Sequence, residues 1–249
     1  MPHPSLQQLD HRPWPIPGTT WRMKQEWHNL LFAHWPVPKS TLEPLVPDPL
    51  QVQEFEGNSW IGVVPFQMEG VTFRPFPVLP RISSFLELNL RLYVEYNGKP
   101  GVWFLSLDAS SRVAVWVARK LFALPYYNAE MKIQENTDTF KYRSKRKHRS
   151  AEPLRFETEY KPTSNSYSAD QGTLEHWLTE RYCLYAMDGD GDLYRTEIHH
   201  APWSLQRAEG DILINEVADP YEIDLQGVPS MLHFSSKIEV VAWMPEKIG

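Results

Sequence analysis

Apolar and polar side chains alternate along much of this chain, and the alternation predicts a protein built mainly from β-strands. In the segment ELNLRLYVE, residues 87–95, leucine or valine occupies every even position, and a polar side chain or tyrosine occupies every odd one. Such period-two alternation places successive side chains on opposite faces of a strand. A helix would let Glu87 and Arg91 pair one turn apart, but it would scatter the leucines around its circumference. The strand therefore fits the pattern better.

The same extended pattern recurs between turn residues along the chain. The Asn97-Gly98 pair between two alternating runs is the strongest short-range hairpin signal in the sequence. Extended segments are expected at 19–38, 50–68, 87–109, 129–164, 184–200 and 236–245, with turns at Glu56-Gly57-Asn58, Asn97-Gly98, Glu135-Asn136 and 148–152. About ten strands arranged as successive hairpins predict one antiparallel β-barrel, closed or nearly closed so that few strand edges stay open.

Helical patterns are confined to two or three short segments. Residues 110–124 form the clearest one, with Ser110 or Ser111 as the N-cap and Pro125 as the stop. Its spacing places Arg112, Trp116 and Arg119 on one face, and Val113, Val117 and Leu121 on another. A second helix is expected at 173–182, and a helical turn at 39–48 with Ser40 or Thr41 as its cap. We expect a single domain over residues 1–249, in which 1–19 is a proline-rich lead.

The composition permits a substantial core and argues against several partners. The 249 residues are 42% hydrophobic and 13% aromatic, and the net charge of −6 disfavours nucleic acid and anionic membranes. A single cysteine, Cys183, excludes an internal disulfide, so a reducing cytoplasm is the simplest location. No secretory signal precedes the first strand, and no run approaches the ~20 apolar residues of a membrane span. The expected partner is a small-molecule ligand, with the oligomeric state left open.

The odd positions of the 87–95 strand, from Glu87 to Tyr93, face either water or an enclosed polar cavity. Glu87 and Arg91 lie about 13 Å apart at Cα at ~3.3 Å per residue, so each needs another partner. Very apolar segments at 60–66 and 101–107 flank this strand. The mixture of acid, amide, base and phenol also suits a ligand cavity better than a solvated face. The cavity interpretation is therefore preferred, with the solvated face as its alternative.

Seven segments in order resemble the YqjF-like family of uncharacterised bacterial proteins. They are WHNLLFAHWPV (27–37), LVPDPLQVQEFEGNSWIGVVPF (45–66), ELNLRLYV (87–94), PGVWFLSLDASS (100–111), LPYYNAEM (124–131), ERYCLY (180–185) and IHHAPWSLQRA (198–208). That family is similar in fold to acetoacetate decarboxylase, an aromatic-rich β-barrel with a central cavity. The resemblance therefore implies a mainly β protein with an antiparallel barrel of the acetoacetate decarboxylase-like type.

The resemblance does not bring the decarboxylase reaction with it. Acetoacetate decarboxylase forms a Schiff base through a lysine with a lowered pKa. By the resemblance, Glu87 stands for that enzyme's strand glutamate, Asp108 for the end of its next strand and Arg119 loosely for a helical arginine. Tyr126 and Tyr127 fall where its lysine pair should be, and tyrosine cannot form an imine. The nearest amines in the sequence are Lys120 and Lys132.

Three other motifs give weaker signals. His199-His200 with His176 lacks the spacing of a zinc site, and the DGDGDLYRTEIH segment lacks the glycine and glutamate of a calcium loop, so no metal and no cofactor is expected. The basic segment KYRSKRKHR, 141–149, is either an anion-binding patch or, as we prefer, a lysine-guarded edge strand. Arg143 is its candidate for an inward-facing residue.

These observations give a set of candidate site residues. Glu87 is the candidate catalytic acid or base, and Arg91 is expected to hold a carboxylate or another anion. The remaining candidates for ligand contact are Asn89, Tyr93 and Tyr126 as orienting groups, Trp60, Phe66 and Trp103 as walls, and His34 and Arg119 as polar anchors. Three functions stay open: acid-base catalysis without a Schiff base, ligand binding without catalysis, and a structural protein with an internal polar network.

Overall fold

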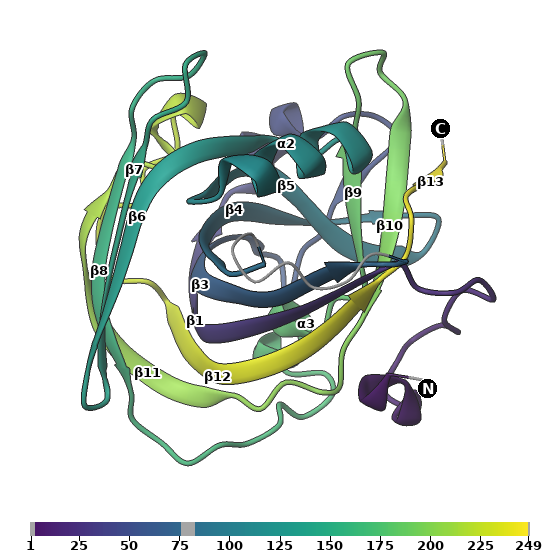
Figure 1. The fold of residues 1–249 in the computed structure, drawn as a ribbon. Helices are drawn as coiled ribbons and strands as arrows, with labels where there is room; N and C mark the ends of the chain where they lie inside the picture. The colour runs from purple at the N-terminus through teal and green to yellow at the C-terminus, as the bar shows by residue number, and fades with distance from the viewer. Residues whose placement is uncertain (1–2, 76–82, 249) are drawn as a thin grey trace.

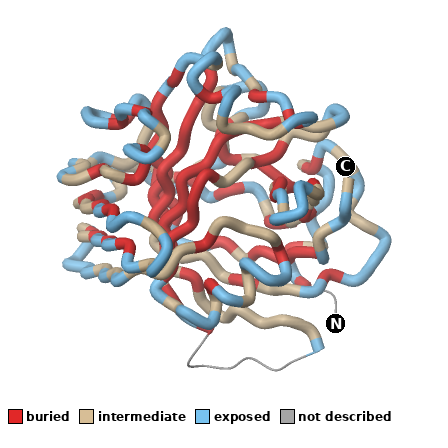
Figure 2. Tube along the Cα trace, turned by 90° about the horizontal axis from the view of Figure 1, so that it is seen from above, coloured by how far each residue is buried: buried red, intermediate tan, exposed pale blue. Residues whose placement is uncertain are grey.

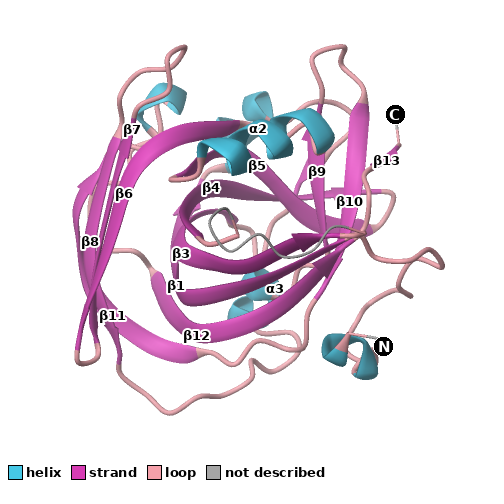
Figure 3. Cartoon of the chain, in the orientation of Figure 1, coloured by secondary structure: helices cyan, strands magenta, loops and turns pink. Residues whose placement is uncertain are grey.

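The computed structural model describes residues 3–75 and 83–248 and confirms a mainly β protein. The strands are β1 (Met23–Val37), β2 (Gln51–Val52), β3 (Ser59–Phe73), β4 (Phe85–Tyr96), β5 (Lys99–Ala109), β6 (Tyr126–Asn136), β7 (Thr139–Arg146), β8 (Arg155–Pro162), β9 (Cys183–Met187), β10 (Leu193–His199), β11 (Gln206–Asn215), β12 (Met231–Ala242) and β13 (Glu246–Lys247). The α-helices in these residues are α1 (Lys39–Leu42), α2 (Arg112–Leu121) and α3 (Leu174–Thr179). Figure 3 shows a strongly curved sheet with α2 above it.

The strands are joined in one sheet whose order is β13-β10-β9-β5-β6-β7-β8-β11-β12-β1-β3-β4-β2. Two further pairings, β10 with β12 and β4 with β5, connect strands that are distant in this order. Most neighbours are antiparallel, whereas β5 runs parallel to both β6 and β9. As Figure 1 shows, β1, β3, β4 and β12 curve beside one another while α2 crosses above them.

Local turn chemistry explains which predicted hairpins form. Asn97 and Gly98 both have positive φ, 50° and 71°, and they join β4 to β5 as predicted. The β6–β7 turn lies at residues 137–138, two positions after the predicted one, and Thr137 takes the positive φ there. The predicted turn around Gly57 also forms, because Phe55 and Asn58 exchange backbone hydrogen bonds across it. The predicted hairpin does not extend beyond this turn, because β2 pairs with β4 and not with β3.

The helices begin close to the predicted places. The Ser111 side chain caps α2 by accepting a hydrogen bond from the Ala114 amide at 3.3 Å. Thr173 caps α3 in the same way. In α1 the N-cap is Pro38, which has no side-chain oxygen, so the predicted cap at Ser40 or Thr41 is wrong.

The basic segment lies inside the sheet. Strand β7 pairs with β6 on one side and β8 on the other, so the edge-strand interpretation is wrong. Lys141 and Arg143 point outward and form ion pairs with Glu159 and Glu157 across to β8. The inward-facing basic residue is Arg146, with a side chain 4% exposed, and not Arg143, which is 63% exposed.

Buried residues are concentrated in the central strands, as Figure 2 shows. Residues 59–66 of β3 are all buried, and β4 is buried from Glu87 to Val94. Polar side chains on β4 are therefore removed from bulk water, as the preferred interpretation of this strand requires. No helix in residues 3–75 or 83–248 has the length and apolar character needed to cross a bilayer.

Candidate functional site

A cavity of about 330 Å³ lies against the face of β4 that carries the odd-numbered polar residues. Most of its wall is apolar and aromatic; typical contributors are Trp27, Phe66, Met68, Phe85, Phe104 and Phe122. Helix α2 contributes Val113 and Val117 to the wall, from the apolar face that the sequence predicted. A few polar groups interrupt this lining, as is usual for sites that bind small organic molecules.

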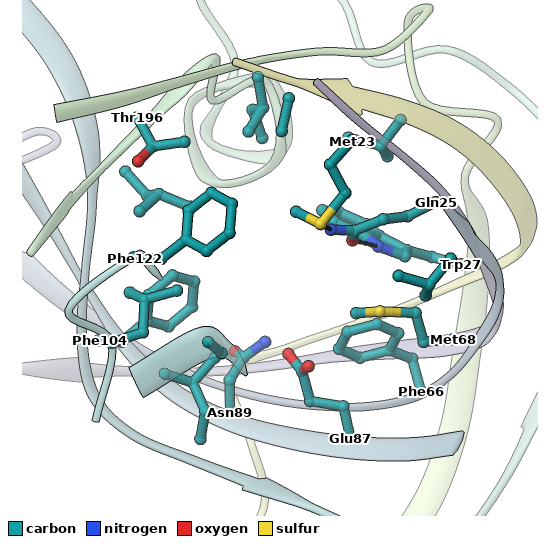
Figure 4. A pocket seen from close by; sticks show the side chains of 18 of the residues that line it. Met23, Gln25, Trp27, Phe66, Met68, Glu87, Asn89, Phe104, Phe122 and Thr196 are labelled. Carbon is teal, nitrogen blue, oxygen red and sulfur yellow. Dashed lines mark hydrogen bonds between the residues drawn. The ribbon is translucent and has the colours of Figure 1, made fainter. Parts of the chain in front are cut away.

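The β4 strand brings Glu87, Asn89 and Arg91 into the cavity wall. In the register of β3 with β4, Phe66 lies opposite Glu87, and Gly62 lies opposite Arg91. Figure 4 shows the Glu87 and Asn89 side chains projecting into the space, with Phe66 and Met68 beside them. The Asn89 Oδ1 atom is buried without a hydrogen-bond partner in the described chain. This acceptor is therefore available to a ligand.

Glu87 is a buried carboxyl group with an altered acidity. The residue is 3% exposed, and its Oε2 accepts a hydrogen bond from the Tyr126 hydroxyl at 2.5 Å. Burial raises the pKa of Glu87 to about 7, because the charged form loses hydration, while the hydrogen bond from Tyr126 and the nearby Asn89 amide oppose this in part. Burial and the charge of Glu87 also raise the pKa of Tyr126, well above its ordinary value, so the phenol stays protonated and can donate this hydrogen bond. At neutral pH Glu87 can thus both donate and accept a proton.

Arg91 is held by a buried network behind the cavity. Its Nε and Nη2 atoms donate to the Tyr93 hydroxyl at 3.2 and 3.1 Å, and Nη2 also donates to the Leu178 carbonyl at 3.2 Å. The Tyr93 hydroxyl in turn donates to His34 Nε2 at 2.6 Å. Burial, with a smaller effect of Arg91, lowers the pKa of His34 well below its ordinary value. The imidazole is therefore neutral, and its Nε2 can accept the hydrogen bond from Tyr93.

Gly62 makes this network sterically possible. A Cβ atom at Gly62 would lie 3.0 Å from His34 Cδ2 and 3.4 Å from Arg91 Cγ. The glycine therefore lets the imidazole and the arginine stem approach the β3 backbone. His34 and Tyr93 themselves lie outside the cavity lining and act on it through Arg91.

Three other predicted residues lie away from the cavity. Trp60 packs with Tyr93 and Leu178 at the end of the β4 polar face that α3 closes. Arg119 donates from Nη1 to the Tyr126 carbonyl at 2.8 Å, which connects α2 to β6. Trp103 turns to the other side of the sheet, where its Nε1 donates to the Leu45 carbonyl at 3.1 Å.

A β-bulge explains the position of Trp103. Along β4 and β5, Leu90 pairs with Ser106 but Arg91 pairs with Phe104, so one extra residue lies on β5. The bulge reverses the alternation from there on, because one inserted residue exchanges the two faces of a strand. Phe104 and Leu107, which lie on opposite sides of the bulge in β5, both line the cavity, and Trp103 does not.

The cavity also contains polar residues that the sequence analysis missed, above all Arg181. Arg181 is 5% exposed and lines the cavity next to Thr179, and His200 and Thr196 line it as well. No periodic pattern pointed to Arg181, because it lies in the short connection between α3 and β9. The available signal was a lone arginine directly before the apolar segment Tyr182–Tyr185.

The described part of the cavity lining offers no lysine amine. No lysine is among the described residues that line the cavity, and both Lys120 and Lys132 are exposed. Tyr126, which the sequence resemblance assigned to one of the two decarboxylase lysine positions, lines the cavity. Asp108, at the end of β5, forms a buried ion pair with Arg146 instead of facing the cavity. The arrangement supplies an acid-base group and guanidinium groups, but no amine nucleophile.

Comparison with known proteins gives one family and one fold. The model of the DUF2071 family of uncharacterized conserved proteins matches residues 24–239. The uncharacterized protein YqjF of Bacillus subtilis (strain 168) is 44% identical over 228 residues, which cover 92% of this chain and 93% of YqjF.

The solved structures that resemble this chain include an acetoacetate decarboxylase and two related enzymes. The acetoacetate decarboxylase from Legionella pneumophila superposes with a TM-score of 0.60 at 14% identity, over 96% of this chain and 93% of that one. An acetoacetate decarboxylase-like enzyme from Sphingomonas wittichii RW1 gives 0.65 at 11%, over 93% and 94% of the two chains. The enduracididine biosynthesis enzyme MppR, complexed with pyruvate, gives 0.63 at 10%, over 93% and 92%.

At these identities the structural likeness shows the fold alone. The family match and the YqjF relative each span most of the chain, and with this fold they agree with the resemblance found in the sequence. The chain belongs to the DUF2071 family, as a relative of YqjF with the acetoacetate decarboxylase-like fold.

Proposed function

We propose that the cavity binds a small organic molecule that carries a carboxylate, and that Glu87 exchanges a proton with it. The observation that carries this proposal is the state of Glu87: a carboxyl group 3% exposed, with a pKa of about 7, in the wall of an otherwise apolar cavity. A proton-transfer group works best when its pKa lies near the operating pH. Burial of an ionisable group beside a cavity is the usual arrangement of such groups.

Each polar group of the cavity has a role in this proposal. The ionised Glu87 removes a proton from the bound molecule, and the Tyr126 hydroxyl steadies the carboxylate that does so. Arg91 holds the ligand carboxylate through its guanidinium group, and Asn89 Oδ1 accepts a hydrogen bond from the ligand. The pairings of β4 with β5 and of β10 with β12 support the further proposal that the sheet closes as a barrel around the cavity.

Proton exchange with small keto acids tests the proposal. The purified protein is incubated in D₂O with keto acids of increasing length, from pyruvate to 7-oxooctanoate, and proton NMR follows the replacement of hydrogen by deuterium next to the carbonyl. We expect exchange above the buffer rate for at least one of these acids, and its loss in Glu87→Gln. Exchange that survives unchanged in Glu87→Gln contradicts the role of this residue.

A chemical test separates this route from that of the decarboxylases. Borohydride treatment in the presence of the same keto acids traps an imine as a stable adduct on lysine. We expect no adduct by mass spectrometry of the intact protein, because no lysine lies in the described lining. A covalent adduct on any lysine would overturn the mechanism.

Ligand binding without catalysis is the second candidate, and the largely apolar lining favours it. This function predicts saturable binding that Arg91→Ala abolishes, with no proton exchange for any acid tested. Native mass spectrometry of the purified protein, which detects a retained ligand by its mass, identifies the molecule in either case. A purely structural network predicts no ligand and a loss of several kcal/mol of stability on Glu87→Gln or Arg91→Ala.

A further inference from the structure

Two buried arginines border the same end of the cavity without a carboxylate partner. Arg91 is 8% exposed and Arg181 is 5% exposed, and both line the cavity. Their guanidinium carbons lie 5.4 and 5.0 Å from the centroid of the Tyr93 ring. Within residues 3–75 and 83–248, neither forms an ion pair with an aspartate or glutamate.

The remaining buried arginines behave differently. Arg12 lies 2.8 Å from Glu197, and Arg146 lies 2.7 Å from Asp108. A buried cation without a counter-charge costs several kcal/mol, so proteins usually pair it. Only at the cavity does the described chain leave two such cations together.

The two guanidinium groups also disfavour each other. Burial, and in smaller part the charge of Arg91, lowers the pKa of Arg181 to about 10, while the Tyr93 oxygen opposes this. Arg181 nevertheless stays protonated at neutral pH. An anion bound between the two groups would relieve both the repulsion and the missing counter-charge.

Donors remain free for such an anion. Arg181 uses Nε for the Trp177 carbonyl at 2.7 Å and Nη1 for Gln53 Oε1 at 2.6 Å, whereas its buried Nη2 has no partner in the described chain. The hydrogen bonds that Arg91 donates come from Nε and Nη2. Of the five hydrogen bonds that the two arginines donate, three go to neutral oxygens of backbone or side-chain amide groups and two to the Tyr93 hydroxyl. These contacts hold the arginines in place and leave their charge uncompensated.

We infer that Arg91 and Arg181 together form one anion-binding site, and that the ligand is an amphiphile with a carboxylate at this end and an apolar body along the rest of the cavity. The inference rests on the proposed function for the location of the site and adds the class of ligand. The aromatic and aliphatic lining, with Phe66, Phe104 and Trp27, suits an alkyl or aryl body.

The spacing along β4 restricts the ligand further. Glu87 and Arg91 are four residues apart on one strand, about 13 Å at Cα. A molecule that reaches both therefore has several carbon atoms between its carboxylate and the group that meets Glu87. Short acids such as butyrate fill only the arginine end, so a medium-chain or aryl carboxylate is the expected class.

Calorimetric titration with octanoate, 1-octanol and butyrate tests this inference. We expect octanoate to bind the wild-type protein at least ten times more tightly than 1-octanol, which has the same chain without the charge, and more tightly than butyrate, which has the charge without the chain. Arg181→Gln and Arg91→Gln should each weaken octanoate binding at least tenfold. Arg143→Gln, which removes an exposed arginine of β7, is the matched control and should bind octanoate as the wild type does.

The outcomes separate this inference from the proposed function. If Arg181→Gln binds octanoate normally and Arg91→Gln does not, the two-arginine site is wrong, while the roles of Arg91 and Glu87 stand. If 1-octanol binds as well as octanoate, or octanoate does not bind at all, the inference fails in the wild-type protein, whatever the variants do. A wild-type protein that exchanges protons with keto acids but does not bind octanoate contradicts this inference and leaves the role of Glu87 intact.

Discussion

Two buried acids on neighbouring strands differ in their partners, because one is paired with an arginine and the other is not. Asp108 on β5 is 2% exposed, and Arg146 donates to its two oxygens at 2.7 and 3.2 Å. Glu87 on β4, whose neighbour Leu88 pairs with Asp108, is 3% exposed and accepts a hydrogen bond from the Tyr126 hydroxyl, with no cation paired to it in the described residues. The nearby arginines of the cavity, Arg91 and Arg181, have no acid either. Buried acids and arginines thus form an ion pair on the β7 side of the sheet, whereas beside the cavity the described acid and arginines have no oppositely charged partner.

The difference separates stability from function. A two-point pair such as Asp108–Arg146 holds β5 against β7 and satisfies both charges. Unmatched buried charges add nothing to stability, and proteins keep such groups mainly where a ligand or a reaction uses them. The following experiments probe the two sides of this comparison.

Breaking the matched pair should have the largest effect. Arg146→Met leaves Asp108 buried without its counter-charge, and we expect the free energy of unfolding to fall by about 3–5 kcal/mol. Urea unfolding followed by tryptophan fluorescence measures it. The double variant Arg146→Met with Asp108→Asn should recover much of the loss, and equal losses in the single and double variants would contradict the pairing.

Neutralising the unmatched acid should have a smaller effect that depends on pH. The folded-state pKa of Glu87, about 7, lies above its unfolded value of 4.5, so the contribution of this group is fully present below pH 4.5 and is lost as the pH rises through 7. Glu87→Gln does not titrate, so its stability relative to the wild type should rise by about 3 kcal/mol between pH 4.5 and 8. Urea unfolding at both pH values gives this difference, and a difference that stays constant would show that the Glu87 pKa is not raised.

Removing the Tyr126 hydroxyl should raise the pKa of Glu87 further. The hydrogen bond from Tyr126 lowers the pKa of Glu87, so Tyr126→Phe should move that pKa above 7, with an energetic effect of ~1–2 kcal/mol. Carbon NMR of the glutamate carboxyl signal across a pH titration reports the midpoint. A midpoint that stays in place would mean that the hydroxyl does not stabilise the carboxylate.

The smallest effect is expected for an ion pair on the outer face of the same β7 strand. Arg143 pairs with Glu157 at 3.2 Å, but the arginine is 63% exposed. Arg143→Ala should therefore cost less than ~1 kcal/mol. A loss as large as that of Arg146→Met, again by urea unfolding, would remove the distinction between inward and outward charges on β7.

The sequence predicts the local features of this molecule well. The Asn97-Gly98 turn, the cap of α2 and the buried apolar face of β4 each depend on residues within a few positions of one another. The resemblance to a known family supplied the overall fold.

Long-range pairing set the limits of the prediction. The bulge that turns Trp103 outward is visible only once β4 and β5 are aligned. The row of lysines and arginines in β7 is typical of an edge strand, and nothing in it indicates that glutamates of β8 pair with them. Arg181 enters the site from a connection whose path is decided by α3 and β9. Residues that approach the cavity from outside its defining strand leave no periodic trace.

The pairing of β1 with both β3 and β12 has a consequence for how the protein is made. Met23 at the start of β1 pairs with Ala242 at the end of β12. One edge of β1 pairs with β3, and its other edge can pair only after β12 has been synthesised. Val240 and Ala242 of β12 also complete the cavity wall. On the ribosome, β1 keeps an open edge until nearly all of the described chain has been translated, so this protein should need protection from aggregation late in synthesis and refold slowly for its size.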